Sequence, residues 1–247
     1  MREEIVYRNC PLCGEKKSES EFDFSHIYPR CCDNKKSVSG FSLEDVIEKK
    51  EIFKENGRAK GKYITQKGFG LYSICSDCNN YSGSHYTNGF KTFYKQGLKA
   101  YENQCSQIVD LSCKNIYPLR IIKEILMMFV IINYDKPLIG NFKNYLLNKE
   151  NQVFPKDYNI YAYFTEDIYR FALHAESNVN GEIVFTTYSL ISYKPFGFIL
   201  THKSEPSPKY NNICNIMAFN KYKYDDQESL VLPLRVINNS VPLSFTF

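Results

Sequence analysis

The pattern of hydrophobic positions changes along the chain and divides it into two parts. Residues 119–134 are apolar on almost every face, which predicts a buried helix. From about residue 158 onward, short runs rich in Tyr, Phe, Ile, Val and Thr predict strands, with turns at 178–181 and 204–208. The second part is therefore expected to be a helix followed by a β-rich region.

The first part shows shorter and less regular segments. Residues 21–28 alternate like a strand, Ser42 is placed to cap a helix that ends near 56–57, and residues 71–74 form another short strand. One longer helix is then predicted by apolar residues at helical spacing: Tyr86, Phe90, Tyr94, Leu98 and Tyr101. We expect an α+β protein with an N-terminal module over residues 1–104 and a helix plus a β-rich domain over 105–247.

Length and composition support a globular protein. The chain has 247 residues, of which 43% are hydrophobic, enough for a sizeable core. No apolar segment follows Met1, and the longest apolar run, 125–132, is too short to span a bilayer. We therefore expect a cytoplasmic protein with no membrane association.

Four of the nine cysteines stand in two CxxC pairs, Cys10 with Cys13 and Cys75 with Cys78. Two such turns supply four thiolates, the ligand set of a structural Zn²⁺ site, and their spacing does not suit a secreted disulfide framework. The alternative is that the pairs are redox-active or unrelated, but neither lies at a βαβ junction. We expect ordinary thiols at the remaining positions, which are Cys31, Cys32, Cys105, Cys113 and Cys214.

Positive charge is concentrated in the first part of the chain. Residues 1–100 hold 17 of the 31 Lys and Arg residues but only 13 of the 27 Asp and Glu residues. The excess lies in one loop and on one stripe of the helix after the second CxxC pair, and it predicts a nucleic-acid-binding face, with simple solvation as the alternative. The residues are Lys54, Arg58, Lys60, Lys62, Lys67, Lys91, Lys95 and Lys99.

Two further motifs accompany the cysteines: SHIYP at 25–29, between the pairs, and CNNYSG at 78–83. This order of motifs over roughly residues 8–100 resembles the zinc-containing branch of the HNH (ββα-metal) nucleases. The resemblance implies that His26 is the general base that deprotonates the attacking water. It also implies that Asn79 is a ligand of a catalytic Mg²⁺ or similar divalent ion, and that the substrate is DNA.

Two positions depart from the pattern of that family. Ser25 stands where many members have an acidic metal ligand, and Gly70 stands where an asparagine usually holds the base. Because residues two apart on a strand share a face, Asp23 is the first candidate for the missing carboxylate. Asp77 in the second CxxC turn ranks second, and His85 ranks third as an imidazole ligand.

The second part resembles, more faintly, a poorly characterised group of bacterial HNH-like proteins in residues 118–123, 195–198 and 232–234. This resemblance suggests a platform that binds substrate or a protein partner. The two resemblances together imply a metal-dependent HNH-type endonuclease acting on DNA, with defence against phages as the expected context. The competing hypotheses are an inactive HNH-like zinc module that binds nucleic acid or protein, and a nuclease subunit that a partner activates.

Overall fold

The computed structural model describes residues 5–36, 38–40, 63–134, 142–166, 170–171, 174–179, 182–202 and 213–237. The helix expected after Ser42 and the turn expected at 204–208 lie outside these residues.

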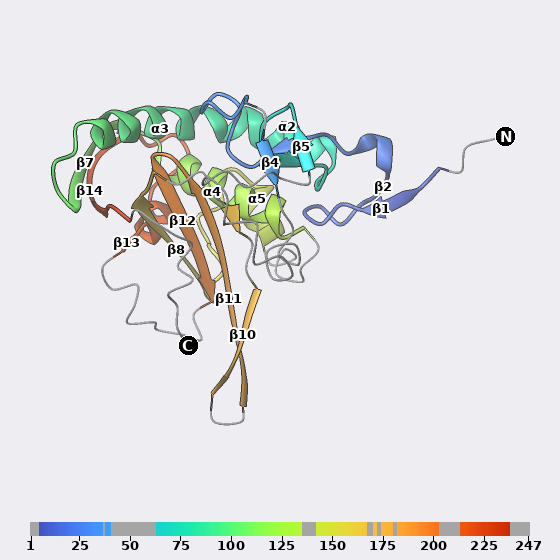
Figure 1. The fold of residues 1–247 in the computed structure, drawn as a ribbon. Coiled ribbons are helices and arrows are strands. Elements are labelled where there is room, and N and C mark those ends of the chain that lie inside the picture. Colours follow the sequence, from blue (N-terminus) through green and yellow to red (C-terminus); the bar gives the residue numbers. More distant parts are fainter. Residues whose placement is uncertain are drawn as a thin grey trace.

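The described structure is mixed α+β, as predicted (Figure 1). Its helical elements are η1 (Glu19–Glu21), α2 (Ser76–His85), α3 (Thr87–Glu102), α4 (Pro118–Ile132), α5 (Lys143–Leu146) and η4 (Met217–Lys221). The strands of the first part are β1 (Tyr7–Asn9), β2 (Lys16–Ser18), β3 (Ser25–His26), β4 (Val38–Gly40), β5 (Tyr63–Thr65) and β6 (Gly70–Leu71). Those of the second part are β7 (Ile108–Ile116), β8 (Tyr158–Phe164), β9 (Arg170–Phe171), β10 (His174–Val179), β11 (Glu182–Tyr193), β12 (Phe196–His202), β13 (Cys214–Asn215) and β14 (Glu228–Arg235).

The strands of the first part form three antiparallel pairs, β1 with β2, β3 with β6 and β4 with β5. In the pair that matters for the site, Ser25 lies opposite Leu71 and His26 lies opposite Gly70. The strand expected over residues 21–28 is therefore much shorter, since η1 occupies its beginning and only two residues pair as β3.

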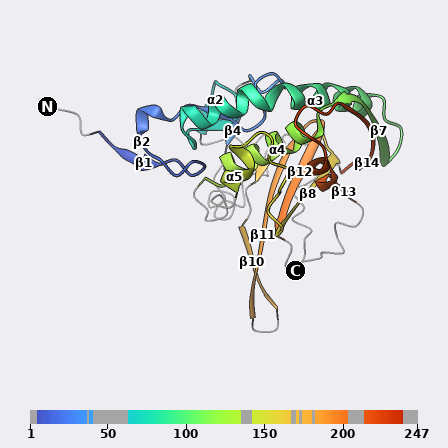
Figure 2. The ribbon, with the colours of Figure 1, turned by 180° about the vertical axis from the view of Figure 1, so that it is seen from behind.

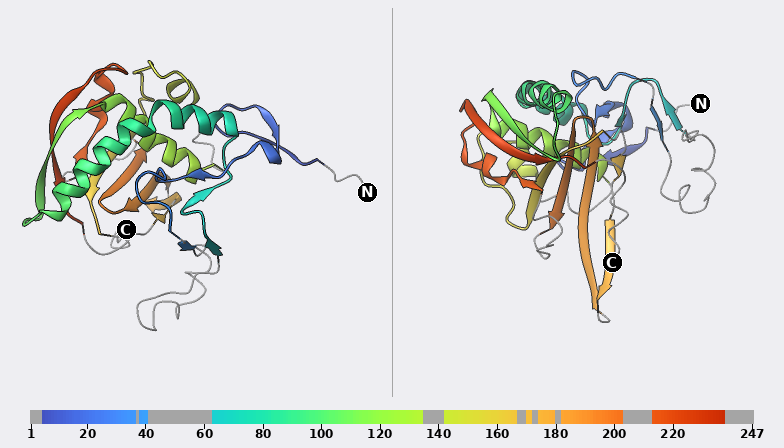
Figure 3. Two further views of the ribbon diagram at one scale, coloured as in Figure 1. Left: turned by 90° about the horizontal axis from the view of Figure 1, so that it is seen from above. Right: turned by 60° about the vertical axis from the view of Figure 1, so that its left-hand side comes forward.

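The second part is rich in strands, as predicted. Its main sheet has the order β10-β11-β12-β8-β13, with β9 also pairing with β11, and the β10–β11 hairpin extends away from the rest of the molecule (Figures 1 and 3). The sequence did not reveal β7, which pairs with β14. This strand buries Leu111, Cys113 and Ile116 and exposes the residues between them.

The predicted apolar helix is α4, and it is buried along nearly its whole length. Its two charged residues in the middle have polar partners. Glu124 accepts hydrogen bonds from Ser82 and Thr87, and Lys123 donates to the carbonyls of Tyr145 and Asn148. Burial raises the pKa of Glu124 to about 7 and lowers the pKa of Lys123 to about 7. The polar groups of α4 thus connect it to α2, α3 and the end of α5.

The single helix expected after the second CxxC pair is two helices, α2 and α3, separated at Tyr86. Tyr86 is fully buried and its hydroxyl donates to the carbonyl of Leu146. The apolar residues at helical spacing belong almost entirely to α3, whereas α2 buries only Cys78 and Ser82. The periodicity therefore identified α3 but gave no sign of where α2 ends.

One continuous hydrophobic core includes residues from both predicted domains. The hydroxyl of Tyr28 donates to the carbonyl of Phe196 over 2.9 Å, and a Cβ at Gly97 would lie 2.0 Å from the Phe196 ring. Seen from behind, α3 extends from the region of α2 to the β7–β14 pair (Figure 2). The first part is therefore packed directly on the β-rich part.

Among the helices in the described ranges, none combines the length and the apolar character needed to cross a membrane.

Candidate metal centre and adjacent histidine

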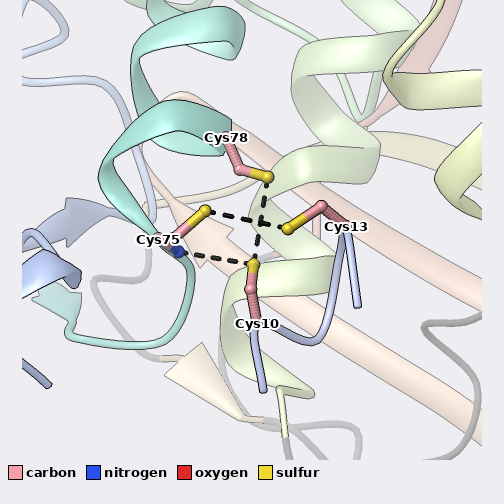
Figure 4. A group of neighbouring side chains, drawn as sticks. All are labelled: Cys10, Cys13, Cys75 and Cys78. Atoms are coloured by element: carbon pink, nitrogen blue, oxygen red, sulfur yellow. Dashed lines mark hydrogen bonds between the residues drawn. The ribbon is translucent and has the colours of Figure 1, made fainter. Parts of the chain in front are cut away.

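The structure brings Cys10, Cys13, Cys75 and Cys78 together, with their four sulfurs within 4.8 Å of one another (Figure 4). The Cys10 and Cys78 sulfurs are 3.9 Å apart, and so are those of Cys13 and Cys75. A zinc ion at about 2.3 Å from each of four thiolates places the sulfurs of a regular tetrahedron about 3.8 Å apart. The cluster therefore has the dimensions of a four-thiolate metal site.

Each CxxC pair is presented by a tight local structure. In the first, the amide of Gly14 donates to the carbonyl of Cys10 over 2.8 Å, and the amide of Cys10 donates to the carbonyl of Glu15. Gly14 has a φ of +81°, which glycine adopts without strain. In the second, Cys75 is the N-cap of α2, and its amide donates to the Cys10 sulfur over 3.4 Å.

The cysteine thiols of the cluster differ in pKa, and without a bound cation some of them stay protonated. The hydrogen bond shared with Cys78 lowers the pKa of Cys10 to about 4, whereas burial raises the pKa of Cys75 to about 11. The hydrogen bond to Cys10 also raises the pKa of Cys78. Four thiolates so close together need a compensating positive charge, and a bound dication supplies it and displaces the remaining protons. The four buried or half-buried sulfurs thus fit a metal ion.

His26 lies on β3, one strand away from the segment that leads into α2. A bridge between Phe22 and Cys75 joins this pair of strands to the second CxxC turn, and α4 contacts β3, β6 and α2. The order of this unit is therefore two antiparallel strands followed by a helix, with the cysteine cluster at the start of the helix.

The imidazole of His26 has a defined orientation. Its Nε2 is 2.9 Å from the carbonyl oxygen of Lys67. Because a carbonyl only accepts, Nε2 carries the proton and Nδ1 holds a free lone pair when the ring is neutral. Burial, together with the positive charge of Arg30, lowers the pKa of His26 below its usual value, so the ring is neutral at pH 7.

A buried amide, Asn34, fixes the backbone that supplies this carbonyl. Its Nδ2 donates to the carbonyls of Tyr28 (2.6 Å) and Phe69 (2.8 Å), and its Oδ1 accepts from the amide of Phe69 (2.7 Å). Gly68 has a φ of +86° and packs against Asn34, where a Cβ would be 2.3 Å from a backbone oxygen. Nothing in the sequence pattern pointed to Asn34, because its partners on the second segment are more than thirty positions away.

Steric crowding explains why glycine occupies position 70. A Cβ there would lie 2.3 Å from the carbonyl oxygen of Ser25 and 2.7 Å from the Phe24 ring. The two strands approach too closely for an asparagine at this position without a shift of backbone.

The candidate ligands of a second metal ion have different surroundings. Asn79 is half-buried in the first turn of α2, and Asp23 is exposed just before β3. Asp77 forms an ion pair with Lys17 at 3.1 Å. His85 has its Nδ1 3.2 Å from the hydroxyl of Tyr224. In the part of the chain that the structure describes, the four cysteines are the only cluster of three or more Cys, His, Asp or Glu side chains that meets the spacing of a metal site.

The predicted basic face is described only in part. Lys67 is exposed near His26, and Lys95 and Lys99 are exposed on α3, with Lys91 half-buried on the same helix. The residues outside the described ranges are Lys54, Arg58, Lys60 and Lys62.

Comparisons with protein-family models, with curated proteins and with solved structures find no match to this chain.

Proposed function

We propose that this protein is a metal-dependent endonuclease of the HNH type that hydrolyses phosphodiester bonds of DNA, with a structural zinc ion bound by the four cysteines. The observation that carries the proposal is the state of His26. It is a half-buried, neutral imidazole whose Nδ1 has no hydrogen-bond partner among the described residues, on a strand pair that leads into the helix bearing Asn79. A neutral base of this kind suits removal of a proton from water.

Each residue has a role in this proposal. The Nδ1 of His26 accepts the proton of the attacking water, while the Lys67 carbonyl holds Nε2–H and stabilises the imidazolium that forms. The amide oxygen of Asn79 and the carboxylate of Asp23 are the oxygen ligands for Mg²⁺ or a similar ion, which prefers such donors. When bound, this ion neutralises charge on the phosphate and on the leaving oxygen.

The test is cleavage of plasmid DNA and of RNA with and without added Mg²⁺ or Mn²⁺. The wild type is expected to nick DNA only with the divalent ion, and His26→Ala and Asn79→Ala to lose cleavage by at least about a hundredfold. Asn80→Ala, at the exposed neighbouring position on α2, is the matched control and should cleave normally. A wild type that never cleaves, or a fully active His26→Ala, would exclude the proposal.

One observation favours a second candidate, a non-catalytic zinc module that binds nucleic acid or a protein partner through the β-rich part. Ser25 is completely buried and its hydroxyl lies 3.4 Å from the carbonyl of Asp23, so it does not replace a carboxylate ligand. This candidate predicts salt-dependent retention of DNA with no cleavage under any metal condition.

A further inference from the structure

Beside His26 lies a group of three side chains, Phe24, Tyr72 and Lys67, which we call the Tyr72 platform. The Phe24 ring contacts the His26 ring edge-on, with centroids 5.2 Å apart, and the Tyr72 ring in the same way at 5.4 Å. The Lys67 ammonium lies 5.8 Å from the Phe24 centroid, within the range of a cation–π contact. Phe24 therefore connects the candidate base directly to an exposed aromatic ring.

Tyr72 is 52% exposed although its side chain is large and aromatic. The Lys67 ammonium is 3.1 Å from the Tyr72 hydroxyl but 5.7 Å from the ring centroid, so it lies at the hydroxyl end of the ring and does not cover its face. Arg8 holds the backbone of the same residue by donating to the Tyr72 carbonyl, and its guanidinium stacks on Phe22 at 3.7 Å. The platform thus presents a large aromatic side chain that is about half exposed, with a cation at its hydroxyl end.

We propose that the Tyr72 platform binds an unpaired nucleotide of a single-stranded nucleic acid, with the base stacked on Tyr72 and the neighbouring phosphate at the Lys67 ammonium. This inference rests on the proposed function and specifies the form of its substrate. In a duplex both faces of each base are already stacked, so an open aromatic ring gains contact only with an unpaired base. The adjacent ammonium matches the charge of the phosphate that such a base carries.

Lys67 couples this platform to the candidate base. Its carbonyl accepts from His26 Nε2, and its ammonium lies at the edge of Tyr72. The His26 and Tyr72 rings both contact the ring of Phe24. A single side chain therefore lies between the candidate base and the exposed tyrosine. A strand held on Tyr72 is therefore expected to lie near the His26 ring.

The experiment measures binding of labelled single-stranded DNA, single-stranded RNA and a DNA duplex of the same sequence by fluorescence anisotropy, without added divalent ions. Tyr72→Ala is expected to weaken single-strand binding about tenfold and to leave duplex binding nearly unchanged. Tyr72→Phe keeps the ring and should bind nearly as well as the wild type. Tyr134→Ala removes another exposed tyrosine, past the end of α4, and should have no effect.

A second set of measurements tests whether the Lys67 ammonium contacts a phosphate. Lys67→Gln should reduce the slope of log affinity against log salt by about 0.7 for single strands, whereas the exposed Lys156→Gln should not. The DNA and RNA arms show which strand the platform prefers. Single-strand affinity unchanged in Tyr72→Ala, or an equal loss for duplex, would overturn the inference.

The experiments distinguish failure of the nuclease proposal from failure of the Tyr72 platform proposal. A wild type that cleaves DNA while its single-strand affinity is independent of Tyr72 keeps the nuclease and removes the platform. A wild type that binds single strands through Tyr72 and never cleaves keeps the platform and removes the nuclease.

Discussion

His26 is the side chain on which the proposed chemistry depends, and its protonation can be measured directly. Because burial lowers its pKa, the neutral form persists to a pH below the usual value of about 6.5 and is lost only as the pH falls through the lowered pKa. Cleavage is therefore expected to persist as the pH falls from 8 towards the usual histidine value and to decline as the pH falls through the lowered pKa of His26. NMR titration of the imidazole gives the midpoint, and a midpoint above 6.5 would contradict the buried, neutral base.

Gly70 allows a matched pair of substitutions. Gly70→Ala places a Cβ against the Ser25 carbonyl and should lower the free energy of unfolding by about 1–3 kcal/mol. Gly83→Ala, on the exposed side of α2, meets nothing within 4 Å and should raise it by about 0.5–1 kcal/mol. Urea unfolding at fixed zinc concentration measures the change in unfolding free energy for both variants. Equal changes for Gly70→Ala and Gly83→Ala would mean that β3 and β6 leave room for a Cβ at position 70.

Asp23 is the first candidate for the missing acidic ligand. Asp23→Asn is expected to abolish divalent-dependent cleavage without changing zinc content or fold, because removing a carboxylate weakens binding of a hard cation. Asp77→Asn provides the comparison, since that carboxylate is already paired with Lys17. Normal cleavage by Asp23→Asn would show that Asp23 does not supply the missing acidic ligand.

At the scale of elements, hydrogen bonds of the Asn34 side chain join the loop after β3 to the segment before β6. Asn34→Ala removes the three side-chain hydrogen bonds to the Tyr28 and Phe69 backbones and should destabilise the protein by about 1–3 kcal/mol. It should also release the Lys67 carbonyl, so that the Nε2–H tautomer of His26 is less populated in ¹⁵N NMR spectra.

The exposed Asn144 on α5 gives the control for this substitution, because its side chain forms no hydrogen bond within the described structure. Asn144→Ala should change neither stability nor the tautomer. An unchanged His26 tautomer in Asn34→Ala would show that the Lys67 carbonyl is held in another way.

Local patterns predicted some elements well and others poorly, for physical reasons. Continuous apolar character identified α4, and the cysteine spacing predicted which four side chains would come together. The β7 strand was missed because its partner β14 lies more than a hundred residues further along the chain. The boundary at Tyr86 was missed because a buried hydroxyl contact to Leu146, not a helix-ending residue, accompanies it.

Within the site, motifs predicted residue types but not their environment. The sequence singled out His26 and Asn79, yet the tautomer of His26 depends on Lys67, 41 positions away. The Tyr72 platform was also missed, because its members are brought together by strand pairing and Phe24 and Tyr72 stand in no motif. The surroundings of these side chains depend on contacts between distant segments, which the periodicity of the sequence does not predict.

At the scale of the whole molecule, the cysteine cluster joins the N-terminal segment to the start of α2, and these cysteines belong to the same core as the β-rich part. The ammonium of Lys143 on α5 also donates to the carbonyl of Cys13. Metal binding at this point is therefore expected to stabilise the strand pair, α2 and their contacts with α4 together.

The most direct test of the account is the zinc content of protein purified without chelators, measured by elemental analysis. We expect about one zinc ion per chain, because four closely spaced thiolates hold such an ion with an affinity coupled to folding. Cys78→Ser should lose the ion and unfold the first part of the chain, whereas Cys105→Ser, at an exposed thiol outside the cluster, should retain both. A folded wild type without zinc would contradict the account.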